Sequence, residues 1–180
     1  MEYHRPVLLT ETVEGLNIQP NGVYVDVTFG GGGHSREILQ RLGEDGRLIA
    51  FDQDEDALQN TIDDPRFLLI HENFRYLKRF LRFHNIKEVD GILGDFGVSS
   101  HQFNVAERGF STRFKADLDM RMNQNAAFSA YDVINKYSEE KLKNVLFQYG
   151  ELRASAGMAR LIVEVRKETP IISSEELKKA

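Results

Sequence analysis

Hydrophobic and polar positions alternate between two periods along the first 95 residues of the chain. Four short segments, rich in β-branched, aliphatic and aromatic residues, have the composition of buried strands: residues 23–28, 47–52, 66–71 and 89–93. Between them, apolar residues recur three and four positions apart, which predicts helices. Strands that alternate with helices are typical of βαβ units, so the sequence predicts an α/β fold with a parallel sheet.

Polar caps and glycines predict where the helices begin and end. Leu9 and Val13 predict a short helix ahead of the first strand. Ser35 is a candidate N-cap for a helix that stops at Gly43. Asp54 is a candidate cap for a short helix after the second strand, and Asn73 for a longer helix after the third, with apolar residues facing inward.

The pattern changes after Asp95. Residues 96–125 are rich in Gly, Ser, Asn, Asp and Arg, which is typical of a long functional loop region. From Ser129, which forms a capping-box pattern with Asp132, the chain is predicted to be helical. The helix expected over 154–167 turns four residues inward: Met158, Leu161, Ile162 and Val165.

Composition narrows the class of protein. The 180 residues are 41% hydrophobic, which is enough for a real core. A net charge of −5 excludes a basic coat over the whole surface but allows a local basic patch. The absence of cysteine excludes disulfide scaffolds, thiolate zinc sites and cysteine nucleophiles, and the five histidines show no metal-ligand spacing. With no long apolar run and no signal peptide, a soluble cytoplasmic protein that avoids membranes is expected.

A run of four glycines, Gly30 to Gly33, lies between the first strand and the next helix. Glycines at such a place let the backbone turn sharply and let a ligand approach the main chain. Asp52 follows Gly32 by 20 positions, at the end of the second strand, where a carboxylate can accept both hydroxyls of a ribose. The alternative reading of Asp52 is a carboxylate that caps a turn.

Two cofactors fit this arrangement, a nicotinamide dinucleotide and S-adenosylmethionine. The dinucleotide fingerprint requires a third glycine where this chain has Ser35. S-adenosylmethionine has an amino-acid tail instead of a pyrophosphate, and Asp26 is placed to assist with its ammonium group. The balance favours S-adenosylmethionine.

Further candidates follow the third and fourth strands. Phe74 could flank an adenine ring, although periodicity alone favours a core residue. Asp95 would face the glycine loop across the crevice at the carboxyl ends of the strands and could hold an amino group. The segment around Glu107–Ser111 and Asp117–Met122 fits either a substrate floor or a salt-bridged surface loop.

A cluster of basic residues follows Phe74. Five cations fall within 13 residues without one acid: Arg75, Lys78, Arg79, Arg82 and Lys87. They could touch phosphates, but a solvated helix face is the favoured reading.

Several strings in order resemble the MraW/RsmH family: YVDVTFGGGGHS, FDQD, VDGILGDFGVSSHQ, ERGFS and LDMRM, preceded by HRPVLLTETVEGL. Members of that family are bacterial S-adenosylmethionine-dependent methyltransferases that act on the N4 of a cytidine in 16S ribosomal RNA. The resemblance runs from about His4 to Pro170. It implies a Rossmann-like class I methyltransferase sheet with an inserted helical subdomain.

The resemblance also implies site residues. The family's cofactor-binding positions fall on Gly32, Gly33, His34, Asp52, Phe74, Asp95 and Gln102. Asp95 is the candidate catalytic residue, which would hold the target amine, and no metal is implied. The chain departs from the family by having Gly31 and Gln53 for Arg, Gly94 and Phe96 for Leu, His101 for Pro, and Asn104 for Asp.

The implied domains are a cofactor-binding domain over 1–125 and a helical subdomain over 126–180. Family members continue past residue 180, so we expect an incomplete chain, with an open edge on the fourth strand that favours a further strand or a homodimer. The absence of cysteine separately favours N- or O-methylation, because C5 methylation of a pyrimidine usually needs a cysteine. The alternatives are an NAD-dependent oxidoreductase and a non-catalytic RNA-binding or ribosome-assembly factor.

Overall fold

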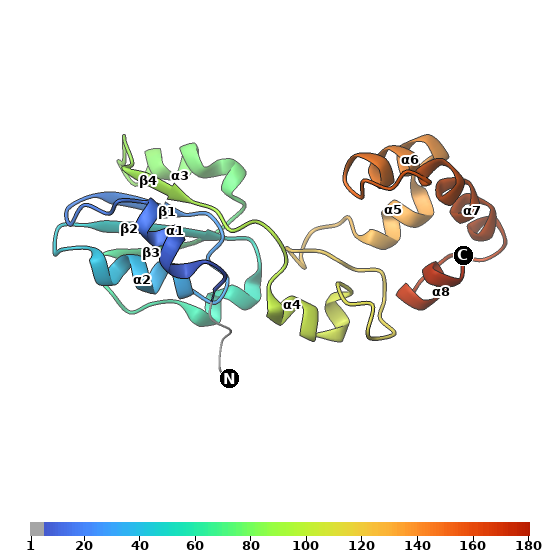
Figure 1. Ribbon diagram of the computed structural model, residues 1–180, viewed down its shortest axis with the longest axis horizontal. Helices are drawn as coiled ribbons and strands as arrows, with labels where there is room; N and C mark the ends of the chain where they lie inside the picture. The colour runs from blue at the N-terminus through green and yellow to red at the C-terminus, as the bar shows by residue number, and fades with distance from the viewer. Residues whose placement is uncertain (1–5) are drawn as a thin grey trace. The chain divides into compact units, whose positions relative to one another are not determined.

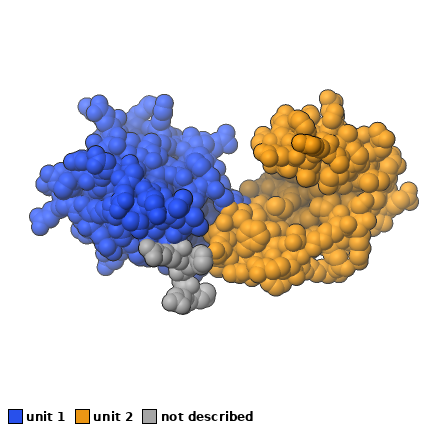
Figure 2. All heavy atoms as spheres, viewed as in Figure 1, with its two compact units in different colours: residues 1–97, 122–124 blue, residues 98–121, 125–180 orange. Residues whose placement is uncertain are grey.

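The computed structural model describes residues 6–180, so His4 in the opening motif lies outside the described residues. The chain forms two compact units, residues 1–97 with 122–124 and residues 98–121 with 125–180 (Figure 2). The bounds differ from those of the expected cofactor domain and helical subdomain. That functional division stays a prediction, because compactness does not report what either part binds.

The first unit is built on a parallel sheet. Within residues 6–180 the strands are β1 (Val23–Asp26), β2 (Arg47–Asp52), β3 (Phe67–His71) and β4 (Gly91–Leu93). Their order across the sheet is β3-β2-β1-β4, and every pairing is parallel (Figure 1). The expected α/β class is confirmed, with each strand inside its predicted segment.

Helices cover both faces of this sheet. The elements are α1 (Leu9–Gly15), α2 (Gly33–Arg41), the 3-10 helices η1 (Glu55–Asn60) and η2 (Phe74–Tyr76), and α3 (Leu77–Phe83). Alternate residues of β1 face opposite ways, as in any strand. Tyr24 packs with α1 and α2, while Val25 packs in a second cluster with α3 (Figure 1).

The predicted cap at Asp54 is confirmed, because Asp54 accepts the Asp56 N–H at the start of a short helix, which is of the 3-10 type. Two other local predictions in this unit are wrong. Helix α2 begins two residues before Ser35, with Gly32 as its N-cap, because the Ser35 hydroxyl is turned inward to a buried partner. Phe74 is 40% exposed and therefore not a core residue.

The second unit is helical. Its elements are α4 (Ser100–Asn104), the 3-10 helix η3 (Ala106–Arg108), α5 (Ala130–Lys136), α6 (Glu139–Gln148), α7 (Ser155–Glu168) and α8 (Ser174–Lys179). The predicted start of α5 is confirmed, since the Asp132 carboxylate accepts the Ser129 N–H at 2.9 Å. A hydrogen bond from Lys136, followed by those from Ser129, lowers the pKa of Asp132 to about 2. The expected loop over 96–125 is partly wrong, because it contains α4 and η3.

The buried face of α7 also differs from the prediction. Met158, Leu161 and Val165 are 39%, 56% and 41% exposed, and of the four residues expected inside only Ile162 is buried. Its buried neighbours on the helix are the small residues Ser155 and Ala159. Small side chains allow close helix contact, so packing follows them rather than the largest apolar residues.

No helix of the described chain combines the length and apolar character that crossing a bilayer requires. After β4, the described residues contain one isolated β-bridge, between Asp117 and Ser173, and no further strand.

Two neighbouring substitutions test the face of α7. Ile162→Ala should lower the free energy of unfolding by about 2–5 kcal/mol, because it leaves a cavity in the core of the second unit. Leu161→Ala, the matched control, should cost about 0.5 kcal/mol or less. Urea unfolding followed by circular dichroism measures both, and equal losses would contradict the orientation.

Candidate functional site

The glycine loop joins β1 to α2 in a conformation that only glycine adopts readily. Gly30 and Gly32 have φ angles of +51° and +74°. A Cβ on Gly32 would lie 2.6 Å from the Arg36 guanidinium, and one on Gly33 would collide with the Pro6 ring. The loop therefore has no room for side chains at these two positions.

Side chains from neighbouring elements fix the loop. The Asp52 Oδ2 accepts the Gly30 N–H at 2.7 Å. Asn60 donates to the Gly30 carbonyl at 3.0 Å, and Arg36 donates to the Gly31 carbonyl at 2.7 Å. These contacts hold two loop carbonyls, while the first N–H groups of a helix have no partner within the helix. The start of α2 thus presents donors on a fixed backbone.

Asp52 has a structural function at the end of β2. It is half-buried, and its Oδ1 accepts the Asp54 N–H at 2.9 Å. Burial raises its pKa, against the effect of these backbone hydrogen bonds. The turn-capping reading is confirmed. Because each carboxylate oxygen has a second lone pair, Asp52 keeps acceptors for hydroxyl groups, and its role toward a ribose stays a prediction.

Asp26 is a buried carboxylate at the end of β1, only 1% exposed. It accepts the Ser35 hydroxyl at 2.7 Å and the Thr28 N–H at 3.0 Å. Burial raises its pKa, and these hydrogen bonds oppose that shift. The expectation that Asp26 reaches a ligand ammonium group is not supported, because its carboxylate holds α2 and the loop instead.

The Thr28 hydroxyl extends this connection to β4 by accepting the Asp95 N–H at 2.7 Å. Ser35, Asp26, Thr28 and Asp95 thus link α2, the end of β1 and the end of β4. The Asp95 side chain remains exposed.

His34, the second residue of α2, has a buried side chain. Its side chain is 6% exposed, and its Nε2 has no hydrogen-bond partner among residues 6–180. At the start of α2, His34 can offer a ligand its main-chain N–H, which is the role that helix N-termini commonly have.

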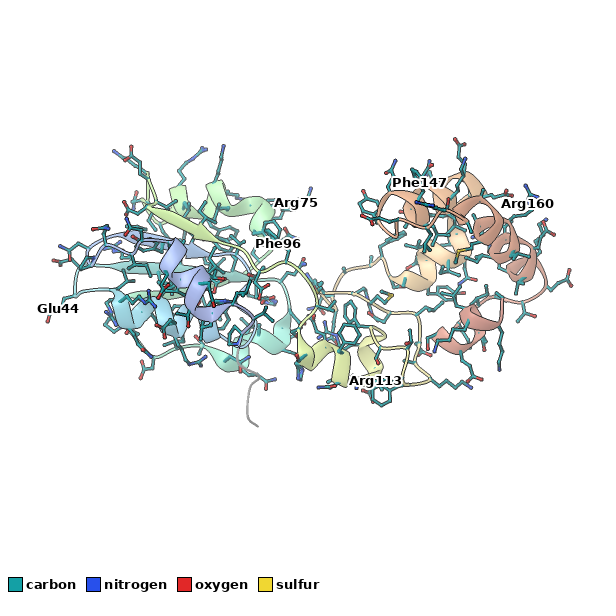
Figure 3. The ribbon with its side chains drawn as sticks, in the orientation of Figure 1. Glu44, Arg75, Phe96, Arg113, Phe147 and Arg160 are labelled. Atoms are coloured by element: carbon teal, nitrogen blue, oxygen red, sulfur yellow. The ribbon has the colours of Figure 1, made fainter. Side chains whose placement is uncertain are left out.

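An aromatic pair lies above the strand ends. The rings of Phe74 and Phe96 are 5.5 Å apart, and Phe96 is 70% exposed (Figure 3). Gln53 positions this region, because its Oε1 accepts the Asn73 amide at 2.8 Å. Asn73 in turn caps η2 through the Arg75 N–H.

Sequence reasoning missed Phe96 as a neighbour of Phe74. A Cβ on Gly94 would lie 2.7 Å from the Phe96 Cζ, so the glycine makes room for the ring. The departures at Gly94 and Phe96 are therefore matched, and their spacing of two residues was the available signal.

Six of the seven predicted cofactor residues belong to the first unit: Gly32, Gly33, His34, Asp52, Phe74 and Asp95. They follow the carboxyl ends of its parallel strands, which is where open α/β sheets bind ligands. Gln102 belongs to the second unit, where its Oε1 accepts the Ser99 N–H at 3.0 Å and caps α4. Its place beside a cofactor stays a prediction.

The two charged motifs of the second unit contact each other. The buried Arg108 donates to the Arg121 carbonyl at 2.9 Å, and Arg121 forms a 2.6 Å ion pair with Asp119. Gly109 allows this approach, since a Cβ there would lie 2.5 Å from the Asp117 carbonyl oxygen. The expected salt bridge is confirmed, but the expected surface position is only partly correct, because Arg108 and Leu118 are buried. A substrate-floor role stays a prediction. Within the described chain, no group of three or more His, Asp or Glu could hold a metal ion.

Asp26→Asn tests the buried carboxylate. Burial holds the folded-state pKa above the ordinary value of 3.8, so this carboxyl stabilises the fold less as pH rises above about 4. The uncharged variant keeps an acceptor for Ser35 and should become more stable relative to the parent over that pH range.

Urea unfolding at pH values between 4 and 7 measures this difference. Asp63→Asn, which removes an exposed carboxyl from the same unit, controls for the loss of one charge. A stability difference for Asp26→Asn that falls as pH rises would contradict the assignment.

The chain is similar over nearly its whole length to proteins that carry one name. The chain is 68% identical over 177 residues to ribosomal RNA small subunit methyltransferase H of Christiangramia forsetii, covering 98% of this chain and 59% of that protein. It is 65% identical over 178 residues to the protein of that name from Flavobacterium johnsoniae, covering 99% and 59%. The chain thus spans about 59% of the length of these two relatives.

A solved structure, a candidate methyltransferase from an antibiotic biosynthesis pathway of Anabaena variabilis, matches at 15% identity and a TM-score of 0.37. It covers 81% of this chain and 61% of that one, and a likeness this weak supports no argument. The model of the MraW methylase family, by contrast, matches residues 1–180. The chain, with its clamped glycine loop and acidic strand ends, therefore belongs to the MraW methylase family.

Proposed function

We propose that this chain binds S-adenosylmethionine at the carboxyl ends of its strands, and that the protein methylates the N4 of a cytidine in small-subunit ribosomal RNA. The glycine loop that Asp52 clamps is the observation that carries the proposal. The names of the relatives support the reaction and the substrate class.

The residues present fit this cofactor. Gly32 adopts a left-handed φ of +74° just before α2, and the start of that helix offers main-chain donors to a carboxylate. Asp52 retains acceptors for the ribose hydroxyls, and Phe74 offers an exposed ring to the adenine. Gln102 belongs to the second unit, and its role toward the cofactor is an expectation from the resemblance alone.

Ser35 argues against a nicotinamide dinucleotide. It occupies the position of the third fingerprint glycine, and its hydroxyl is committed to the buried Asp26. This hydrogen bond anchors α2 to β1. A glycine at position 35, as the dinucleotide fingerprint requires, would remove the hydroxyl and with it the anchor.

When bound, S-adenosylmethionine supplies a methyl group on a sulfonium. The chain must hold the cytidine amine, whose lone pair is delocalised into the ring and which is therefore a weak nucleophile. Asp95 is exposed for this role, and its main chain is fixed by Thr28. Its carboxylate would accept the amine N–H bonds and orient the nitrogen, which is catalysis by position and electrostatics.

An RNA substrate in ribosomal subunits would place the protein in the cytoplasm. Within the described residues β4 is an edge strand of the sheet, and its unpaired edge supports association with a second copy or with a further strand.

Asp52→Ala should weaken S-adenosylmethionine binding by about 1.5–3 kcal/mol, or roughly 10- to 150-fold, as for a lost hydrogen bond to a charged group. Isothermal titration calorimetry measures it. Asp63→Ala, an exposed carboxylate of the same unit, should bind like the parent. Binding of NAD without S-adenosylmethionine would refute the cofactor proposal.

Asp95→Ala should abolish methyl transfer and leave the fold intact, because alanine keeps the main-chain N–H that Thr28 accepts. Mass spectrometry of ribosomal RNA from a strain that carries the variant should show no N4-methylcytidine from this enzyme. Glu88→Ala, an exposed control, should retain it. Retained methylation in the Asp95 variant would remove Asp95 from the mechanism. Unchanged N4-methylcytidine in a gene-deletion strain would refute the substrate.

A further inference from the structure

Beside the aromatic pair, four exposed cations gather around a hollow on α3 and the turn before it. The hollow has a volume of about 320 Å³ and is lined by Arg75, Tyr76, Lys78, Arg79 and Arg82. Lys78, Arg79 and Arg82 lie on α3 at positions i, i+1 and i+4, and Arg75 lies in η2 directly before it, so all four border the same hollow. We call these four cations, with Tyr76, the α3 basic face.

The cations of this face lack acidic partners. Other cations of the chain form ion pairs, such as Arg41 with Glu37 and Lys167 with Glu164. Among the described residues, none pairs with a cation of the α3 basic face within 4.0 Å. In a chain of net charge −5, four unpaired cations in one hollow form a local positive field.

Aromatic surface adjoins this field. Tyr76 is 41% exposed, with the Arg75 guanidinium 5.3 Å from its ring centroid. Arg75 directly follows Phe74, whose ring contacts that of Phe96. The side chains of Arg75 and Phe96 can be followed in Figure 3. Cations that track a backbone beside rings that stack on bases are the combination by which proteins bind single-stranded nucleic acid.

We propose that the α3 basic face binds the phosphates of the RNA substrate close to the nucleotide that is methylated. The proposal rests on the proposed function for its RNA substrate, and it assigns the contact to four named cations. This proposal replaces the interpretation of these cations as a solvated helix face. Cations that act only in solubility have no reason to line one hollow together with an exposed aromatic ring.

Binding of a fluorescently labelled single-stranded RNA oligonucleotide, measured by anisotropy over a range of salt concentrations, tests this. The variant changes Arg75, Lys78, Arg79 and Arg82 to Gln. Each lost phosphate contact should make the slope of log K against log salt shallower by about 0.7, so four losses approach a change of about 3. Affinity at low salt should fall at least tenfold.

The matched control removes four cations that already have acidic partners, by changing Arg41, Lys136, Lys167 and Lys179 to Gln. Both variants have the same net charge, so a general charge effect would appear in both. The control should keep the parent's salt slope. S-adenosylmethionine affinity should be unchanged in both variants, and the urea midpoint should be unchanged in the basic-face variant, whose cations have no ion pairs to lose.

The outcomes separate this proposal from the function it rests on. Loss of RNA affinity in the basic-face variant alone, with cofactor binding retained, supports the α3 assignment. Equal salt slopes in the two variants, or a parent chain that binds phosphatidylserine vesicles but no RNA, would overturn it. A parent chain that binds RNA through this face but binds no S-adenosylmethionine would refute the proposed function and leave the α3 assignment standing.

Discussion

The arrangement of the first unit depends on one buried carboxylate. Burying a carboxylate costs free energy unless hydrogen bonds satisfy its oxygens, so Asp26 is stable in its place only if neighbouring residues donate to it. Ser35 and Thr28 supply these hydrogen bonds, and in doing so they fix the start of α2 and the second residue after β1. The glycine loop between these two anchors is therefore held at both ends. The glycines are needed because they adopt left-handed φ angles and because neighbouring side chains lie close to them. The position of the loop is set by the hydrogen bonds of Asp26.

The same principle connects the remaining strand ends. Asp52, at the end of β2, accepts the Gly30 N–H of the glycine loop. Gln53, just after β2, accepts the Asn73 amide after β3, and Thr28 accepts the main-chain N–H of Asp95 after β4. Each contact joins segments that are distant in sequence and adjacent only because parallel strands end at one edge. The main chain of Asp95, for example, is held by Thr28, a residue outside the candidate cofactor set, and such support preorganises a site.

The sequence predicted this sheet and its site because both depend on local pattern and strand direction. Strand composition and the position of the glycines were enough to place Asp52 and Asp95 at one edge. Packing between helices was harder to predict: the buried face of α7 follows Ser155 and Ala159, whose small size gives no hydrophobic signal. Long-range hydrogen bonds were equally hidden, because Ser35 has the local pattern of a helix cap and only the fold shows that Asp26 takes its hydroxyl.

Gly94 and Phe96 act as one packing unit, and this constrains how the segment after β4 could be exchanged with that of a relative. With a side chain at position 94, a ring at position 96 could not occupy its present place, since even a Cβ would lie within 2.7 Å of it. A side chain at position 94 would push the ring outward, since Phe96 is 70% exposed and has space to turn, and the ring would then lose its contact with Phe74. A loop transplanted between relatives would need to carry both residues together.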